Sequence, residues 1–282
     1  MHYDAADYPA DASKFLPFVV LEAALTQRIW HEDNLQTLDR AAPQWSATQA
    51  EGAQAVNALL AAGHSDVPGE NFDRAGLLIG YETDGLSPSA KVLSGHDLSP
   101  IQHVRRLIMS CCTMGRTEDI FGEPLGMASA AFGYKTRFAV GYLIPVDDMA
   151  ATLFSAALQH QLARLSVAQS NDDRYWRETF QRTRQTIQRG EWPEGFGEWL
   201  SEHLAEAMWL AAPVDSAETK DQRTHWRRAL SHLRNDLRLD AKIVRVAKID
   251  VQASIPVIAH SVASGPPPLL RASMRWVICL GG

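Results

Sequence analysis

Between residues 55 and 165, short apolar runs alternate with connectors that are rich in glycine and polar residues. Runs of about four to eight apolar residues bounded by turn-forming residues are typical of buried β-strands. The pattern predicts strands at about 55–62, 76–80, 104–109 and 138–144. Strands recurring in this way with connectors and helices predict an α/β fold.

A helix is predicted directly after the last of these strands. Pro145 ends the strand, and Asp147 or Asp148 then caps a helix that runs to about Arg164. Met149, Leu153, Ala157 and Leu162 form its apolar stripe.

Beyond residue 166 the sequence changes to charged helical segments, at about 172–189 and 197–211. Aromatic side chains are frequent there, and we expect them to anchor the helices against the core by packing. The aromatic residues are Tyr175, Trp176, Phe180, Trp192, Trp199 and Trp209.

The C-terminal part resembles strands at 242–249 and 274–280, separated by a stiff proline-rich connector at 265–268. No internal repeat is visible. We therefore expect a single domain over residues 1–282. Its core motifs lie in 55–165, helices elaborate it over 166–240, and strands follow over 241–282.

The overall charge does not suggest a polyanionic partner. The chain has 27 Lys and Arg against 33 Asp and Glu, a formal charge of -6, whereas proteins that bind phosphate backbones usually present excess positive charge. The first residues do not resemble a signal peptide, and no apolar run reaches the roughly 20 residues that cross a bilayer. We expect a cytoplasmic protein that binds neither nucleic acid nor membrane.

The chain has three cysteines, Cys111, Cys112 and Cys279. This odd, small number does not suggest a disulfide framework. No second pair of Cys or His stands at ligand spacing from the neighbouring cysteines, so we expect no metal site. The chain also lacks a phosphate-binding glycine loop, and we expect no cofactor.

Two reactive side chains each follow a predicted strand. His64 comes after the segment 55–62, and Cys112 comes after 104–109. Reactive groups in open α/β sheets gather at the C-terminal ends of strands. A cysteine nucleophile needs a base to remove its proton, and that base is usually a histidine. We predict a dyad in which His64 and Cys112 face one cleft from adjacent parallel strands.

Six short strings in this region resemble, in order, those of CHAT domains, which are caspase-like modules often joined to TPR repeats. They are Ala-Gly-His-Ser at 62–65, Ala-Gly-Leu-Leu-Ile at 75–79, Leu-Ser-Gly-His-Asp-Leu at 93–98, Met-Ser-Cys-Cys-Thr-Met-Gly at 109–115, Leu-Gly-Met-Ala-Ser-Ala-Ala-Phe at 125–132 and Ile-Pro-Val-Asp-Asp at 144–148. The 48 residues from His64 to Cys112 also resemble the roughly 50-residue interval of caspases. The resemblance implies a caspase-like α/β/α sandwich with a mostly parallel central sheet.

The resemblance places Cys112, and not Cys111, at the nucleophile position. Cys111 takes the place of an alanine, and by strand alternation its side chain is expected to point into the core. His96 and His103 are alternative bases, but they lie in the connector before the cysteine strand. A dead or differently assembled site is a further alternative.

Ser65 stands where the family has glycine after the histidine. The resemblance implies that the backbone N–H groups of Ser65 and Cys112 bind the oxyanion. A serine adopts some of the conformations open to glycine only with strain, so catalysis could be weakened. Glu118, Asp119 and Glu123 follow the nucleophile and could line a pocket for a basic side chain, or could be solvated.

The resemblance implies a cysteine endopeptidase that cleaves a protein substrate under the control of a partner or ligand. Bacterial relatives often act in regulated proteolysis. A non-catalytic, protein-binding CHAT-like scaffold is the alternative, supported by Ser65. An unrelated acyl-transfer enzyme is a third possibility, disfavoured because the chain has no Gly-x-Ser-x-Gly elbow.

Overall fold

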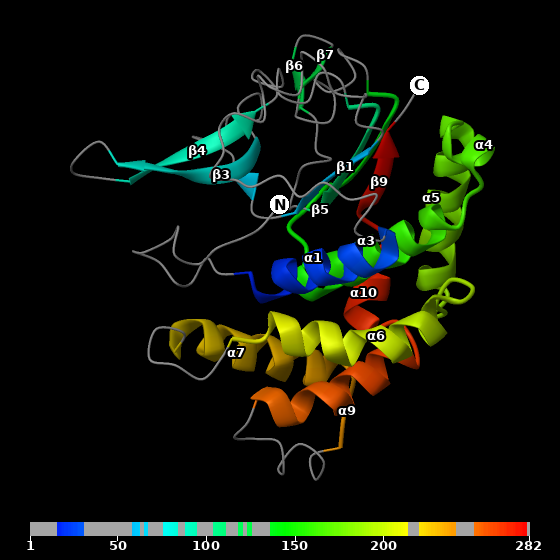
Figure 1. The fold of residues 1–282 in the computed structure, drawn as a ribbon. Helices are drawn as coiled ribbons and strands as arrows, with labels where there is room; N and C mark the ends of the chain where they lie inside the picture. The colour runs from blue at the N-terminus through cyan, green and yellow to red at the C-terminus, as the bar shows by residue number, and fades with distance from the viewer. Residues whose placement is uncertain are drawn as a thin grey trace.

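A four-stranded sheet lies at the centre of the fold in the computed structural model (Figure 1). The structure describes residues 16–30, 58–62, 65–66, 76–83, 88–94, 104–110, 118–120, 123–125, 136–213, 220–240 and 251–280. The strands, in spatial order, are β1 (Ala58–Ala62), β5 (Arg106–Ser110), β8 (Phe138–Tyr142) and β9 (Val277–Leu280). β1, β5 and β8 are parallel, and β9 is antiparallel to β8. The predicted α/β fold with a mostly parallel central sheet is therefore confirmed.

The three parallel strands overlap segments that the apolar runs predict as strands, and β5 extends one residue beyond its predicted end. β5 and β8 are buried along their whole length, which explains why they are not alternately polar and apolar. Leu107 and Met109 point to one face of the sheet and Ile108 to the other, and all three are buried.

The remaining described strands form two small antiparallel sheets. One contains β2 (Ser65–Asp66), β3 (Gly76–Thr83) and β4 (Pro88–Ser94), and β3 contains the predicted strand 76–80. The other is a hairpin of β6 (Glu118–Ile120) and β7 (Glu123–Leu125).

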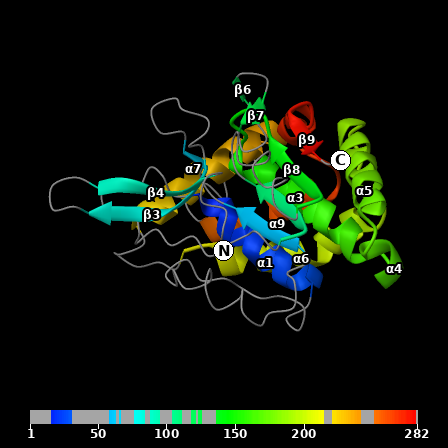
Figure 2. The same cartoon turned by 90° about the horizontal axis from the view of Figure 1, so that it is seen from above.

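Helices below the sheet in Figure 1 form two layers. α1 (Pro17–Trp30) and α3 (Asp148–Ala163) lie side by side next to the strands, as the view from above also shows (Figure 2). α3 and α5 contact the sheet, whereas α6, α7 and α9 lie beyond α1 and α3. The other helices are α4 (Val167–Ser170), α5 (Asp173–Gln188), α6 (Phe196–Ala211), α7 (Lys220–Asp236), α9 (Val251–Ala263) and α10 (Pro268–Ser273).

Two consecutive aspartates at the start of α3 accept hydrogen bonds from the first turns of two different helices. Asp147 is the N-cap of α3, and its side chain accepts a hydrogen bond from Ala150 N at 3.1 Å. Asp148 instead accepts from Phe18 N in the first turn of α1, at 3.0 Å. Thr152 Oγ1 donates to Phe18 O at 2.9 Å. Because helix N-termini leave backbone N–H groups without intrahelical partners, this pair of residues joins the starts of α1 and α3.

Most of the aromatic anchors predicted after residue 166 do pack against the core. Trp176 and Phe180 on α5 are buried, and Trp192 and Trp199 are half-buried against the same hydrophobic cluster. Trp209 differs from the prediction, because 45% of it is exposed near the end of α6.

The C-terminal part contains two helices between the two segments that were predicted as strands. β9 falls within the predicted strand at 274–280, but α9 and α10 occupy most of residues 251–273; the predicted strand at 242–249 lies outside the described residues. Val251, Ile255, Ile258 and Val262 of α9 are buried at helical spacing. Pro256 lies inside α9 and removes one backbone donor, so the local sequence disfavours a helix there. Tertiary packing of α9 against α6 and α7 stabilises the helix nonetheless.

Candidate functional site

The two strands that precede the candidate dyad are neighbours in the central sheet. β1 and β5 pair in parallel, and the register places Ala62 opposite Ser110 at their C-terminal ends. The adjacency and parallel direction predicted for the two strands are therefore confirmed. In sequence, His64 is the second residue after Ala62, and Cys112 is the second residue after Ser110.

The reactive side chains themselves lie outside the described residues. This holds for both members of the dyad, for the second cysteine and for the two alternative bases, namely His64, Cys112, Cys111, His96 and His103. Their roles remain predictions.

Ser65, proposed from the resemblance as an oxyanion donor, begins β2 and pairs with Leu77 of β3. Strand residues have an extended backbone, which any L-residue adopts. A serine in a strand therefore does not require the left-handed conformation that favours glycine.

The acidic residues proposed for a substrate pocket lie on the β6–β7 hairpin and not in an irregular loop. Glu118 pairs with Leu125, Asp119 with Pro124, and Ile120 with Glu123. Only the backbone of this hairpin is described, so the pocket remains a prediction.

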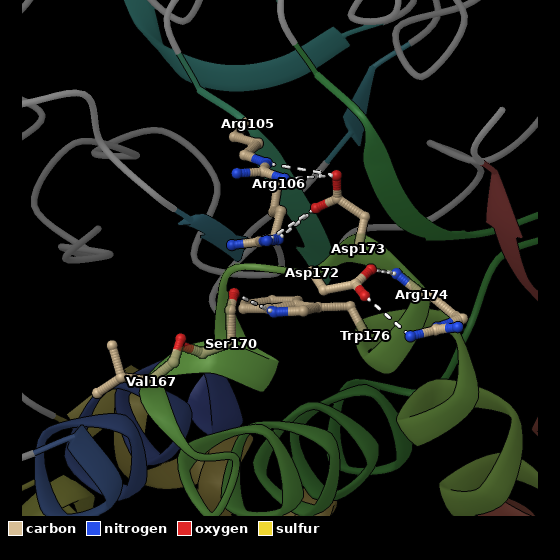
Figure 3. Close-up of polar contacts among 8 residues, drawn as sticks. All are labelled: Arg105, Arg106, Val167, Ser170, Asp172, Asp173, Arg174 and Trp176. Atoms are coloured by element: carbon tan, nitrogen blue, oxygen red, sulfur yellow. Dashed lines mark hydrogen bonds and ion pairs between the residues drawn. The ribbon is translucent and has the colours of Figure 1, made fainter.

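The start of β5 is fixed by a buried ion pair (Figure 3). Arg106 is fully buried, and its Nε donates to Asp173 Oδ1 on α5 at 2.8 Å. Its guanidinium lies 4.4 Å from the centre of the Trp176 ring, also on α5. The Trp176 ring is itself held, because its Nε1 donates to Ser170 O at 3.0 Å. Arginine favours such planar contacts with carboxylates and aromatic faces.

A second arginine shares the same carboxylate. Arg105 Nη2 donates to Asp173 Oδ2 at 2.9 Å, so both Asp173 oxygens are bonded. Burial lowers the pKa of Arg106, and the charge of Asp173 opposes that shift. The arrangement keeps a buried charge compensated and joins the first residue of β5 to α5.

The other end of β5 lies next to a buried acid on α1. Glu22 is only 1% exposed, and burial raises its pKa to about 8. The hydroxyls of Ser155 and Ser110 oppose this shift, so both lie close to the carboxyl. Glu22 is therefore mostly protonated at neutral pH.

Sequence reasoning missed Glu22. A signal was present, because Phe18, Leu21, Leu25 and Ile29 have the spacing of an apolar helix face and Glu22 adjoins Leu21 on it. An acidic residue beside such a face predicts a buried carboxyl group. It does not predict which strand end the carboxyl group contacts.

A family model of the CHAT domain matches residues 9–225, well over half of the chain. The chain belongs to the CHAT domain family. This family is related to caspase-like cysteine peptidases. No curated protein and no solved structure matches the chain significantly.

The matched range of the CHAT domain includes α1 with Glu22, the paired strands β1 and β5, and both candidate reactive residues. α9, α10 and β9 lie beyond it, although β9 completes the central sheet and α9 packs on α6. The fold around the CHAT match therefore depends on residues that follow it.

Cys279 is the cysteine of this CHAT chain whose surroundings are described. It lies on β9 and is half-buried, and burial raises the pKa of its thiol to about 12. A thiol with so high a pKa contains almost no thiolate at neutral pH, so it is a poor nucleophile.

Within the described ranges, no group of three or more His, Cys, Asp or Glu side chains is placed to hold a metal ion. None of the helices in that part of the CHAT chain is both long and apolar enough to pass through a bilayer.

Proposed function

We propose that this CHAT domain is a cysteine endopeptidase with Cys112 as its nucleophile and His64 as its general base. The observation that carries the proposal is the parallel pairing of β1 with β5, with Ala62 opposite Ser110. Each candidate residue follows this last pair by the same two positions.

Chain geometry makes contact between the two side chains feasible. Paired strands lie about 4.8 Å apart, and two residues extend a chain by at most about 7 Å. Ala62 and Ser110 are register partners, so their side chains point to the same face of the sheet. If both chains continue in the same way, His64 and Cys112 emerge on one face within reach of each other.

The chemistry would be acyl transfer through a covalent intermediate. His64 takes the thiol proton, the Cys112 sulfur forms a bond to the scissile carbonyl carbon, and the electron pair moves to the oxygen. The carbonyl re-forms as the C–N bond breaks, and His64 gives the proton to the leaving amine. Water then hydrolyses the thioester and regenerates the thiol.

The remaining parts of the proposed site have supporting roles. The backbone N–H groups of Ser65 and Cys112 would stabilise the oxyanion, which the extended backbone of β2 permits. Glu118, Asp119 and Glu123 would bind a basic side chain next to the cleaved bond. The substrate would be a cytoplasmic protein, and a protein partner or ligand would regulate access to the site.

The test is site-resolved alkylation of the intact protein with iodoacetamide, quantified by mass spectrometry. Cys112 should react much faster than Cys279, whose pKa of about 12 makes it an internal reference. His64→Ala should slow the reaction at Cys112, because it removes the base that lowers the thiol pKa. Cys111→Ala is the matched control, since it changes the neighbouring thiol and should leave the rate at Cys112 unchanged.

Cleavage is then measured on candidate partner proteins by locating new termini. Cys112→Ala and His64→Ala should each abolish it, and the double variant should be no worse than either, because the two residues act as a unit. Equal, slow labelling of all three cysteines would instead indicate a non-catalytic binding scaffold. Cleavage that persists in purified Cys112→Ala protein would refute the mechanism.

A further inference from the structure

A hydrogen-bonded row of side chains leads from α1 through α3 to Glu22. Trp30 Nε1 donates to Gln159 Oε1 at 3.0 Å, and Gln159 Nε2 donates to Ser155 Oγ at 3.0 Å. Ser155 Oγ has thus accepted a hydrogen bond, and its own proton is available to the Glu22 carboxyl close by. The row orients Ser155 as a donor towards Glu22.

On its other side, Glu22 is close to Ser110, the last residue of β5. Glu22 Oε1 and Ser110 Oγ are both buried. Each lacks a hydrogen bond of ordinary length to any of the described residues. Buried polar atoms normally have partners.

We propose that Glu22 is a positioning residue for Cys112, and that its carboxyl holds the end of β5 through Ser110. This proposal rests on the function proposed above. A buried carboxyl is suited to the task, because one of its oxygens can accept from the Ser155 hydroxyl and the other from the Ser110 hydroxyl. Cys112 follows Ser110 by only two residues, so the position of the strand end limits where the thiol can lie.

The surroundings of Glu22 keep it neutral. Asp148 on α3 adds to the effect of burial, because its negative charge also disfavours ionisation of Glu22. On β5 the contacting group is the uncharged Ser110, and on α3 it is Ser155. The ion pair between Arg28 and Glu206 joins α1 to α6. It is largely exposed and does not neutralise a negative charge on Glu22. Raising the pH through about 8 ionises Glu22, and the hydroxyls of Ser155 and Ser110 favour the ionised form.

The experiment measures the rate of iodoacetamide alkylation at Cys112 against pH, in the full chain. Glu22→Ala should lower the rate about tenfold at neutral pH, since small displacements of a reacting group have large effects. Glu22→Gln provides both an acceptor and a donor, so it should keep most of the rate. The wild-type rate, corrected for thiolate fraction, should not decline as Glu22 ionises above about pH 8, because the ionised carboxyl still accepts from both hydroxyls.

Glu206→Gln is the control, because it breaks the exposed contact between α1 and α6 without touching the interior. Equal rates at Cys112 in Glu22→Ala and wild type at every pH, with His64→Ala still slow, would overturn the role of Glu22 and leave the dyad intact. A loss of the difference in rate between Cys112 and Cys279 in Glu22→Ala would indicate general unfolding, and would also overturn the proposal. If wild-type Cys112 reacts no faster than Cys279, the proposed function itself fails.

Discussion

Replacing Glu22 with glutamine should remove a large pH dependence from the stability of the protein. The pKa of Glu22 rises from 4.5 to about 8 in the folded state. Each pKa unit corresponds to about 1.4 kcal/mol, so the ionised form destabilises the fold by about 5 kcal/mol relative to the neutral form. Glu22 is buried and its largest pKa effect is desolvation, so solvent screening does not reduce this value much.

The sign of this pH dependence follows from the number of protons that the folded and unfolded states bind. Between about pH 4.5 and pH 8 the folded protein keeps the Glu22 proton while the unfolded chain releases it, so the free energy of unfolding falls as pH rises. Glutamine does not titrate. The stability of Glu22→Gln relative to wild type should therefore increase by about 1.4 kcal/mol per pH unit, or about 3 kcal/mol between pH 5 and pH 7.

The assay is urea unfolding of both proteins at a series of pH values, with stability obtained by linear extrapolation. Taking the difference cancels the contribution of Asp148, whose pKa burial raises to about 7, because both proteins contain it. Glu202→Gln, an exposed substitution on α6, is the control and should show a constant difference within about 0.5 kcal/mol. A difference between Glu22→Gln and wild type that does not change with pH would refute the burial of a neutral acid.

Three other substitutions or treatments test further features. Asp173→Ala should lower the free energy of unfolding by about 3–5 kcal/mol in urea titrations, because it leaves Arg106 charged and buried, and the double change Arg106→Met/Asp173→Ala should recover part of that loss. Gly195→Ala should lower the free energy of unfolding by about 1–2 kcal/mol in the same assay, because φ is 73° there and the new methyl group would lie 2.7 Å from an Arg164 nitrogen. Gly265→Ala is the control and should lower it much less, because nothing lies within 4 Å of the new methyl group. Alkylation of Cys279, followed by mass spectrometry at mildly alkaline pH, should be slow in the folded protein and become fast in urea, and equally fast labelling without urea would show that the thiol is not shielded.

The elements that sequence patterns predicted are those whose residues bury a continuous or periodic surface. β8 and the middle of β5 are apolar because both strands are buried along their length, and the charged helix α5 has buried residues at regular spacing. α9 could not be predicted in this way. Pro256 opposes a helix locally, and the contacts with α6 and α7 that stabilise it come from distant parts of the chain.

In the candidate site, too, the sequence predicted the features that depend on local patterns and missed those that depend on contacts between distant segments. The order of strand, His64, strand and Cys112 is local information, and it correctly predicted that β1 and β5 are parallel neighbours. The contact between Glu22 and Ser110 joins α1 to a strand end far along the chain. No periodicity within either segment encodes such a contact, because it depends on how α1 docks on α3.

The shared start of α1 and α3 also has an electrostatic consequence. Each helix N-terminus carries a partial positive charge, and here two of them meet just after β8 ends. Because β8 is parallel to β5 and β1, this is the edge of the sheet at which Ser110 and Ala62 lie. The combined field favours negative charge at that edge, and ionised Asp147 and Asp148 weaken it. Asp148 has a pKa of about 7, so acidification through neutral pH strengthens the attraction for anions.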